Sequence, residues 1–421
     1  MRNFWKRWAA GLAMSGIATL AAAEPAKTLS LSAWQFLQAG RGDQIWQVLA
    51  GYEQTQPDVG LKKVAYPYSS YIKTISTQLG ARSGPDLLLL NDVDLANFAR
   101  AGVLEPLDDV VDEGLRGRLA EVNDLARVDG KRYALNFDTV TFALVWNRTL
   151  LAQAGVQPPR DFAGLLAASQ AVREKAGVPG YGERNQTNNE EQLWNAISTW
   201  TIGYGGVWSK DGKLTIDAPA NVQALADFKK LQAGGGVAVG DDFSTLRTRF
   251  AQGKIGMLIE SSSNVQSILS SKDAAIGAQD IGIGRPPFPL DAVRGSSSYI
   301  AINAHGKNKA EAKQYLKWLF TPPVQQRLQE ALGGSVVGTT QVPPPAAFLA
   351  GNPWASQYFK QAPRARTAVI VDFEEKTPQI RTIIVSEFAK VLLGNEDVAQ
   401  ALGRAQTRAE QAVRKLSLIH I

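Results

Sequence analysis

Residues 84–92 read Gly-Pro-Asp-Leu-Leu-Leu-Leu-Asn-Asp, and this short segment decides the fold class. Four consecutive leucines between turn-forming residues are typical of a strand buried on both faces, as strands in parallel sheets are. The chain before it shows strand patterns over 27–33 and 59–65 and helix patterns over 43–54 and 70–79. Strand and helix in alternation predict βαβ units with a parallel sheet, and therefore an α/β fold.

Downstream of this segment the same mixture of patterns continues to the end of the chain. Residues 131–147 read as two strands separated by a short polar break. Caps, glycines and prolines delimit the other elements. We expect helices within 153–180 and over 190–204, 222–231, 245–252, 309–320, 377–393 and 397–416, and strands over 213–217, 254–259 and 299–303.

Three segments are predicted to cross between two halves of the molecule: 131–147, the proline-rich 281–289 and the Gly/Pro-rich 333–345. Three crossings build each half from separate pieces of chain and join the halves by a hinge, which permits closure around a ligand. The predicted units are a signal peptide over 1–23, a first α/β lobe over 24–137 plus 285–337, and a second over 138–284 plus 338–421.

Composition excludes several classes of protein and of site. The 421 residues are 45% hydrophobic and 20% charged, the balance of a globular protein large enough for two domains. Cysteine is absent, which excludes disulfides and thiolate chemistry. The chain has two histidines, His305 and His420. This number argues against a histidine-rich metal site and against a Ser-His-Asp triad. We therefore predict no metal and no cofactor.

The amino terminus has the pattern of an export signal. Basic Arg2, Lys6 and Arg7 precede an apolar stretch over 9–20, and Ala21-Ala22-Ala23 supplies the small residues for cleavage before Glu24. The apolar stretch is too short to span a bilayer, which takes roughly 20 residues. Because the chain has no cysteine, a lipid anchor attached to a cysteine side chain is excluded. We expect a mature protein free in the periplasm.

Charge argues against a nucleic-acid partner. The formal net charge is +6, and the predicted signal carries three of the positive charges and no acid. The basic residues of the remaining chain are scattered, whereas a nucleic-acid binder shows a clustered basic footprint.

Several stretches together resemble a known family. They are 84–90 followed by 101–107, 133–139 followed by 145–147, 250–257, and 295–302 followed by 312–320 and Gln325-Gln326. In this order they are similar to the sugar-type (family 1, maltose-binding-protein-like) extracellular solute-binding proteins of ABC importers. The resemblance implies a two-lobed periplasmic-binding-protein fold with a ligand cleft between the lobes. It further implies a monomer that makes no chemical change, closes on a carbohydrate, and delivers it to inner-membrane permease subunits and their ATPase.

Candidate ligand residues follow from two arguments. Ligands of open α/β sheets bind beyond the carboxyl ends of the strands, and a sugar needs aromatic platforms beside convergent polar groups. Glu191 also matches a position that the resemblance places near the ligand, and Arg366 would suit an acidic sugar. The candidates are Trp34, Gln35, Tyr68, Tyr71, Asn91, Asp92, Asp138, Glu191, Trp194, Tyr204, Trp208, Glu260, Ser261, Ser263, Ser297, Ser298 and Arg366. Each has a plainer interpretation as a core, capping or surface residue.

Two alternative functions stay open at this point. A secreted carbohydrate-active enzyme would use paired carboxylates, for which Glu190-Glu191 and Asp241-Asp242 are the candidates. A binding protein for a polyol, sugar acid or sugar phosphate would keep the same architecture. A basic cleft would favour the acid or the phosphate. The apolar end, Ser417 to Ile421, has no physical explanation in the sequence.

Overall fold

A computed structural model describes residues 26–417 apart from 39, 341 and 395. The predicted signal peptide and the last four residues of the apolar C-terminus lie outside the described residues. Among the helices that are described, none is both long and apolar enough to cross a bilayer.

The leucine-rich segment forms the buried strand that was predicted. Strand β3 (Leu87–Asn91) has its four leucines at most 1% exposed. It lies in parallel beside β1 (Lys27–Ser32), which pairs in parallel with β2 (Val59–Val64). Helices α1 (Gly42–Ala50), α2 (Tyr52–Thr55), α3 (Tyr68–Gly80) and α4 (Asp92–Arg100) connect or follow these strands. The prediction of parallel βαβ units is confirmed.

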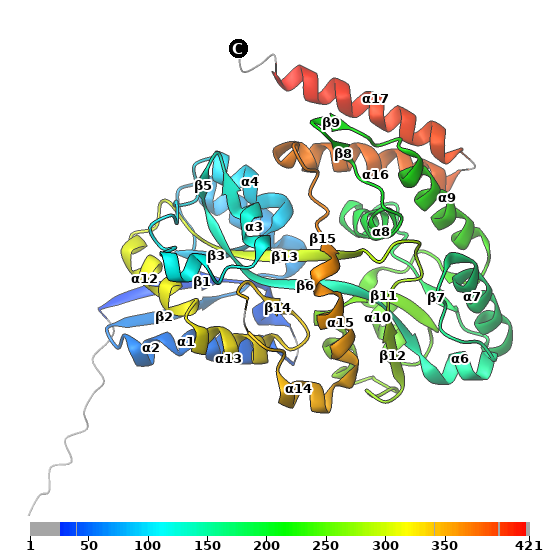
Figure 1. The fold of residues 1–421 in the computed structure, drawn as a ribbon, viewed down its shortest axis with the longest axis horizontal. Coiled ribbons are helices and arrows are strands. Elements are labelled where there is room, and N and C mark those ends of the chain that lie inside the picture. The colour runs from blue at the N-terminus through cyan, green and yellow to red at the C-terminus, as the bar shows by residue number, and fades with distance from the viewer. Residues whose placement is uncertain (1–25, 39, 341, 395, 418–421) are drawn as a thin grey trace, which may run out of the picture.

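Two long strands run through the middle of the molecule. Strand β6 (Ala134–Asn147) and strand β13 (Val293–Ile302) pair antiparallel from Gly295 opposite Thr141 to Ala301 opposite Ala134. Figure 1 shows both strands extending from the blue and cyan half into the green half. They are the central connection between the halves.

Two expectations about these crossings are wrong. Residues 134–147 form one strand without a break, because the side chains of Asn136 and Asp138 find buried hydrogen-bond partners within the sheet. The second crossing lies in β13 and not in 281–289, since β12 (Ile281–Gly284) pairs with β6 inside the second half. The third crossing passes through β14 (Val336–Val337), which pairs with β6 at Thr139 and Asp138.

The main sheet has the strand order β10-β7-β11-β6-β13-β3-β1-β2. Strands β12 and β14 also pair with β6, and β15 (Ala365–Arg366) pairs with β13. The strands of the second half are β7 (Tyr181–Gly182), β10 (Val237–Ala238) and β11 (Met257–Ser261). Strand β11 begins and ends later than the 254–259 predicted, because Ser261 still pairs with Phe142 of β6.

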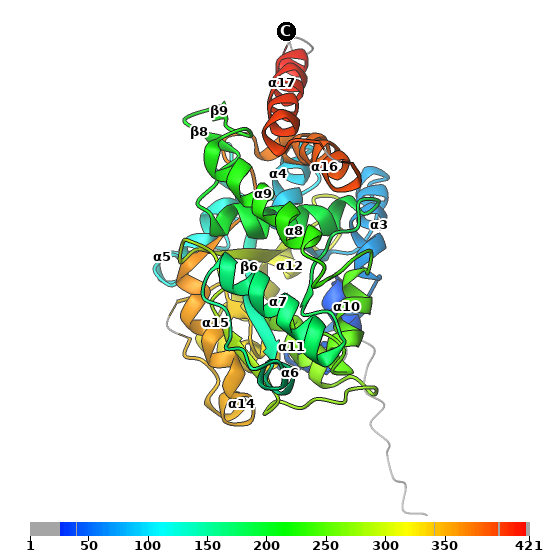
Figure 2. The same cartoon turned by 90° about the vertical axis from the view of Figure 1, so that its right-hand side faces the viewer.

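Helices cover both halves and keep the predicted order. The first half has α5 (Glu113–Arg116), α12 (Lys309–Leu319) and α13 (Pro322–Leu332) in addition to α1–α4. The second half has α6 (Arg148–Ala154), α7 (Phe162–Ala176), α8 (Glu190–Gly203), α9 (Pro219–Ala233), α10 (Phe243–Ala251), α11 (Ser262–Leu269), α14 (Ala346–Gly351), α15 (Ser356–Gln361), α16 (Thr377–Leu393) and α17 (Val398–Ser417). Figure 2 shows α17 at the top of the molecule above α16.

The apolar side chains form separate cores on the two sides of the central strands. One core contains buried residues from 29–137 and from 299–337. Two further cores contain residues from 142–288 and 354–409. Each half is therefore a lobe with its own core, and each is built from pieces of chain that are distant in sequence.

Candidate functional site

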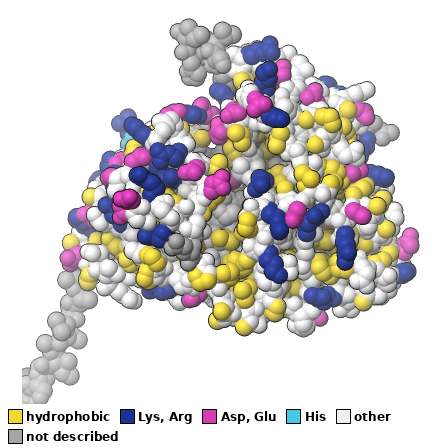
Figure 3. All heavy atoms as spheres, viewed as in Figure 1, with side chains coloured by type: hydrophobic (Ala, Val, Ile, Leu, Met, Phe, Trp, Pro, Cys, Tyr) yellow, Lys and Arg dark blue, Asp and Glu magenta, His cyan; other side chains and the backbone are white. Residues whose placement is uncertain are grey.

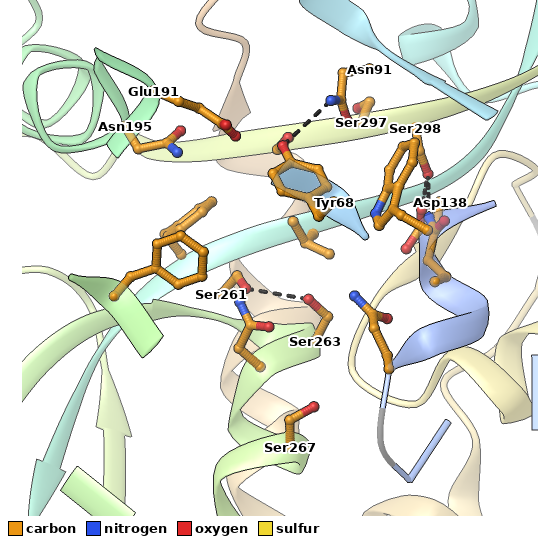
Figure 4. A pocket seen from close by; sticks show the side chains of 18 of the residues that line it. Tyr68, Asn91, Asp138, Glu191, Asn195, Ser261, Ser263, Ser267, Ser297 and Ser298 are labelled. Atoms are coloured by element: carbon orange, nitrogen blue, oxygen red, sulfur yellow. Dashed lines mark hydrogen bonds between the residues drawn. The ribbon is translucent and has the colours of Figure 1, made fainter. Parts of the chain in front are cut away.

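A recess with polar walls lies where the two lobes meet. It is a pocket of about 400 Å³ whose walls come from β3, β6, β13, α3, α8, α10 and α11. Figure 4 shows side chains from both lobes pointing into it. Ten of the predicted ligand residues line it: Trp34, Gln35, Tyr68, Asn91, Asp138, Glu191, Ser261, Ser263, Ser297 and Ser298.

The wall from the first lobe begins directly after β1, where the chain turns into the short helix Trp34–Leu37. The Trp34 ring packs edge-on against Tyr71, with the ring centroids 5.0 Å apart, and against Tyr68 at 5.6 Å. Gln35 Nε2 donates to Ser298 Oγ over 3.2 Å. Asn91, at the end of β3, donates to the Tyr68 hydroxyl over 3.4 Å. This wall thus has an aromatic surface and a line of polar groups.

The base of the pocket is formed by the central strands. The buried carboxylate of Asp138 on β6 accepts a hydrogen bond from Ser298 Oγ of β13 and lies 3.4 Å from Arg41 Nη2. Burial lowers the pKa of Arg41, and the Asp138 charge partly offsets this effect. Ser297 Oγ lies 2.9 Å from Thr139 Oγ1. The polar break seen in the sequence is therefore the polar base of the pocket.

The wall from the second lobe comes from α8 and from the start of α11. Glu191 and Asn195 lie one turn apart on α8, whose amino end is capped by the Asn189 side chain. In Figure 4 the carboxylate of Glu191 points toward the Tyr68 ring of the other lobe. Ser261 Oγ lies 3.3 Å from Ser263 Oγ and accepts from Asn264 Nδ2 over 2.7 Å.

Four arginines line the pocket, and the sequence analysis identified none of them: Arg41, Arg184, Arg247 and Arg294. Arg184 and Arg247 both bind the carboxylate of Glu260, at 2.9 Å and 2.7 Å. Burial alone would raise the pKa of Glu260, but these two cations lower it to about 2. No local pattern singles these arginines out, because arginine is ordinarily an exposed residue and its burial is decided only by the fold.

Seven predicted residues lie outside the pocket wall, and three of them are held behind it. The Tyr71 hydroxyl is buried and donates to the Ser32 carbonyl over 2.9 Å. The Asp92 carboxylate accepts from Thr367 Oγ1 over 2.9 Å and faces the joint between the lobes. Glu260 is 2% exposed and serves as the counterion of the arginines.

The predicted aromatic platforms of the second lobe are core residues. Trp194 and Trp208 stack on each other with centroids 5.5 Å apart, and both are buried in the second-lobe core. The Tyr204 hydroxyl donates to Asp227 over 2.7 Å. Trp194 lies on the buried face of α8, and Tyr204 and Trp208 follow the end of this helix. Arg366 is exposed on β15 and donates to the Ala365 carbonyl, away from the pocket.

The carboxylate pairs considered for an enzyme do not face each other across the pocket. Glu190 accepts from Arg381 and Thr382 on the outside of α8, while Glu191 lines the pocket. Asp241 pairs with Arg249, and Asp242 caps α10 through the backbone N–H of Thr245. Among the described residues no cluster of three or more histidines and carboxylates could hold a metal ion.

The surface outside the pocket carries charges of both signs. On the face seen in Figure 3, lysine and arginine side chains are interspersed with acidic ones. This face offers no single basic footprint of the kind that binds a nucleic-acid backbone.

Comparison with known proteins adds three findings. The model of the family described as bacterial extracellular solute-binding protein matches residues 37–326. A binding protein of Brucella abortus (strain 2308) is 23% identical over 423 residues, covering 97% of this chain and 99% of the relative. The sn-glycerol-3-phosphate-binding periplasmic protein UgpB of Agrobacterium fabrum is 23% identical and covers 91% of this chain and 92% of its own length.

Among solved structures, the GacH receptor of Streptomyces glaucescens superimposes with a TM-score of 0.79 at 23% sequence identity. The match covers 93% of this chain and 99% of the receptor. The two proteins share the whole two-lobed fold.

Proposed function

Because the chain belongs to the family of bacterial extracellular solute-binding proteins, we propose that it captures a small polyhydroxylated solute in the pocket between its lobes and delivers it to an ABC importer. The lobes are taken as 24–137 plus 285–337 and 138–284 plus 338–421, and the separate hydrophobic cores support this assignment except at 285–292, where Phe288 packs in the second-lobe core. Capture and delivery involve no bond making.

The observation that carries this proposal is a set of buried polar atoms in the pocket-lining residues that have no hydrogen-bond partner among the residues the structure describes. They are Gln35 Oε1, Gln38 Oε1, Arg41 Nε and Arg294 Nε. An unpaired buried polar atom costs roughly 1–3 kcal/mol, so these residues gain from a ligand that brings both donors and acceptors. A solute rich in hydroxyl groups supplies both.

The arrangement of the central strands supports closure as the mechanism. Strands β6, β13 and β14 carry the chain between the lobes, and residues of both lobes line one pocket. A small rotation about these strands would bring α8 and α11 toward Trp34 and Tyr68 and bury the solute. The closed shape would then be the form that the permease recognises.

Location and assembly belong to the same proposal. Export by the signal over 1–23 with cleavage after Ala23 would release the protein, without a lipid anchor, on the side of the membrane where the importer collects its solute. A monomer suffices, because both walls of the pocket come from one chain.

A carbohydrate-active enzyme remains the less favoured candidate. Of the two carboxylates in the pocket wall, Asp138 is held by Arg41 and by Ser298 at the base. A carboxylate whose oxygens already contact a cation and a hydroxyl donor of the protein is not free to face the bond of a bound substrate.

The test is a thermal-shift screen of the purified protein with neutral sugars, polyols, sugar acids and sugar phosphates, followed by calorimetry. A ligand at about 100 times its Kd should stabilise the protein by roughly 2.7 kcal/mol. Recovery of the compound unchanged is expected, and its conversion would instead establish an enzyme. Small-angle scattering should show compaction with the bound ligand.

A matched pair of variants separates binding from folding. Trp34→Ala removes the aromatic surface of the pocket, and Trp354→Ala removes an equally buried ring from the second-lobe core. Both should lower the melting temperature, since each deletes a large buried side chain. Only Trp34→Ala should weaken ligand binding. Equal affinity in the two variants would contradict this site.

A further inference from the structure

Arg294 is a buried cation in the pocket wall that lacks a direct partner. Its side chain belongs to β13, lines the pocket, and is 8% exposed. Within the part of the chain that the structure describes, its guanidinium forms no hydrogen bond and no ion pair, and its Nε is closed off from solvent. A buried charge is normally paired, because removing it from water is costly.

The neighbours of Arg294 add positive charge. Its guanidinium lies 4.6 Å from the centre of the Phe142 ring, and the Arg184 guanidinium lies 5.5 Å from the same centre. Arg247 shares the Glu260 carboxylate with Arg184 and also covers the Phe243 ring at 4.4 Å. The guanidinium groups of Arg184, Arg247 and Arg294 therefore lie in one part of the pocket, and the carboxylate that forms ion pairs there is that of Glu260.

Two other carboxylates are near Arg294 without pairing with it. Asp92 lies behind the wall, where Thr367 Oγ1 and the backbone N–H of Val93 donate to it. Glu191 lines the pocket on the side of Tyr68. Burial lowers the pKa of Arg294 to about 10 in spite of the attraction of Asp92. The surrounding acids therefore do not offset the cost of burying this cation.

The aromatic rings in this part of the pocket are also unsuited to a neutral sugar. Phe142 and Phe243 each have a guanidinium over the ring, so those faces are not open to the apolar C–H face of a sugar. A guanidinium is a donor only, and its planar fork matches the two oxygens of a carboxylate or phosphate.

We propose that the solute carries an anionic oxygen group, a carboxylate or a phosphate, which binds Arg294 and Arg184 beside Phe142. This inference rests on the proposed function and specifies its ligand class as a sugar acid, a sugar phosphate or a polyol phosphate. The hydroxyl groups of the same solute meet the polar groups of the remaining wall, where the Glu191 carboxylate and Gln35 Oε1 accept hydrogen bonds.

The experiment measures affinity for matched compounds by calorimetry: glucose, glucuronate and glucose 6-phosphate, and glycerol with glycerol 3-phosphate. The anionic member of a series should bind at least about a hundredfold more tightly than the neutral member, the size of a buried charge-assisted pairing. Comparing glucuronate with glucose 6-phosphate distinguishes the carboxylate from the phosphate. Inorganic phosphate alone tests whether the group binds without its hydroxylated part.

Arg294→Gln should lower affinity for the anionic compound by roughly ten- to a hundredfold, and Arg294→Lys should recover part of it because the charge is kept. Arg366→Gln is the matched control, since Arg366 lies opposite Arg294 on the paired strand β15 but is exposed and outside the pocket. Its affinity should equal that of the unmodified protein. Melting temperatures of all three variants verify folding.

The outcomes separate this inference from the proposed function. Tight binding of a neutral sugar or polyol, with no preference for its anionic counterpart and no effect of Arg294→Gln, would overturn the anionic ligand and leave the solute-binding function standing. Failure of every compound in the wider panel of sugars, polyols, acids and phosphates to bind would overturn both.

Discussion

Ser298 of β13 lies opposite Asp138 of β6 at the point where the register of the two strands shifts, and its hydroxyl donates to the Asp138 carboxylate. The next pair is Tyr299 with Asn136, so Phe137 of β6 has no opposite residue. A bulge of this kind bends a strand and redirects side chains. The bulge thus places the polar base of the pocket at the bend between the lobes.

The pair of Asp138 with Arg41 should be important for stability. Both side chains are at most 5% exposed, so removing the carboxylate leaves an uncompensated buried cation. We expect Asp138→Asn to lower the free energy of unfolding by about 3 kcal/mol in denaturant titrations. Asp124→Asn is the control, because Asp124 pairs with Arg132 but is 73% exposed. It should cost less than about 1 kcal/mol. An equal loss of unfolding free energy in the two variants would contradict a stabilising role of the buried pair.

The contribution of Glu260 should depend on pH. Its pKa in the folded protein is about 2 against an ordinary value of 4.5, because Arg247 and Arg184 outweigh the effect of burial. A lowered carboxylate pKa stabilises the fold above pH 4.5, and this stabilisation is lost as pH falls toward 2. Glu260→Gln should cost about 3 kcal/mol at pH 7. The difference between variant and unmodified protein should shrink by pH 2.5. A difference that stays constant with pH would contradict the ion pairs.

Asp94 should show the opposite dependence. Burial raises its pKa to about 6 from an ordinary value of 3.8. A raised carboxylate pKa means that the protein loses stability as pH rises from about 4 to 6, since the folded state must give up a proton it prefers to keep. Asp94→Asn should therefore stabilise the protein by about 1 kcal/mol at pH 7, allowing for partial exposure, and should have no such effect at pH 4. Thermal unfolding at the two pH values measures this.

Gly338 should not tolerate a side chain. A Cβ placed there would lie 2.0 Å from the carbonyl oxygen of Asn136, a backbone atom of the central strand. Gly338→Ala should destabilise the protein by about 2 kcal/mol or more. Gly403→Ala is the matched control, since Gly403 lies within α17 with open space around it. There alanine should stabilise by about 0.5–1 kcal/mol. Destabilisation of similar size at both positions would contradict the close approach.

Local pattern alone accounts for most of the fold that was predicted. The four leucines of β3, the alternation in β1 and the apolar face of α12 depend on residues next to each other in sequence, and the predicted elements agree with the structure to within a few residues. Trp34 and Asn91 were predicted as ligand residues from their positions at strand ends, and both line the pocket. The carboxyl ends of parallel strands meet at one edge of the sheet, which is where ligands bind.

The predictions were wrong at residues whose side chains contact residues distant in sequence. The aromatic spacing of α8 could not distinguish a ring that faces a ligand from one that faces the core, so Trp194 was expected in the pocket and lies beneath it. The polar residues of β6 read as a break because their partners, Ser298 and Arg41, are about 160 and 97 residues away.

Periodicity and the order of short motifs were enough to predict the α/β class, the two-part organisation and the resemblance to solute-binding proteins. The electrostatic character of the pocket, in contrast, depends on how distant segments come together in the fold. Arg184, Arg247 and Arg294 come from separate segments, and none of them stands out in a chain with 45 basic residues. Whether an arginine is a solvated surface charge or an anion-binding group depends on its burial and its partners, which exist only after folding.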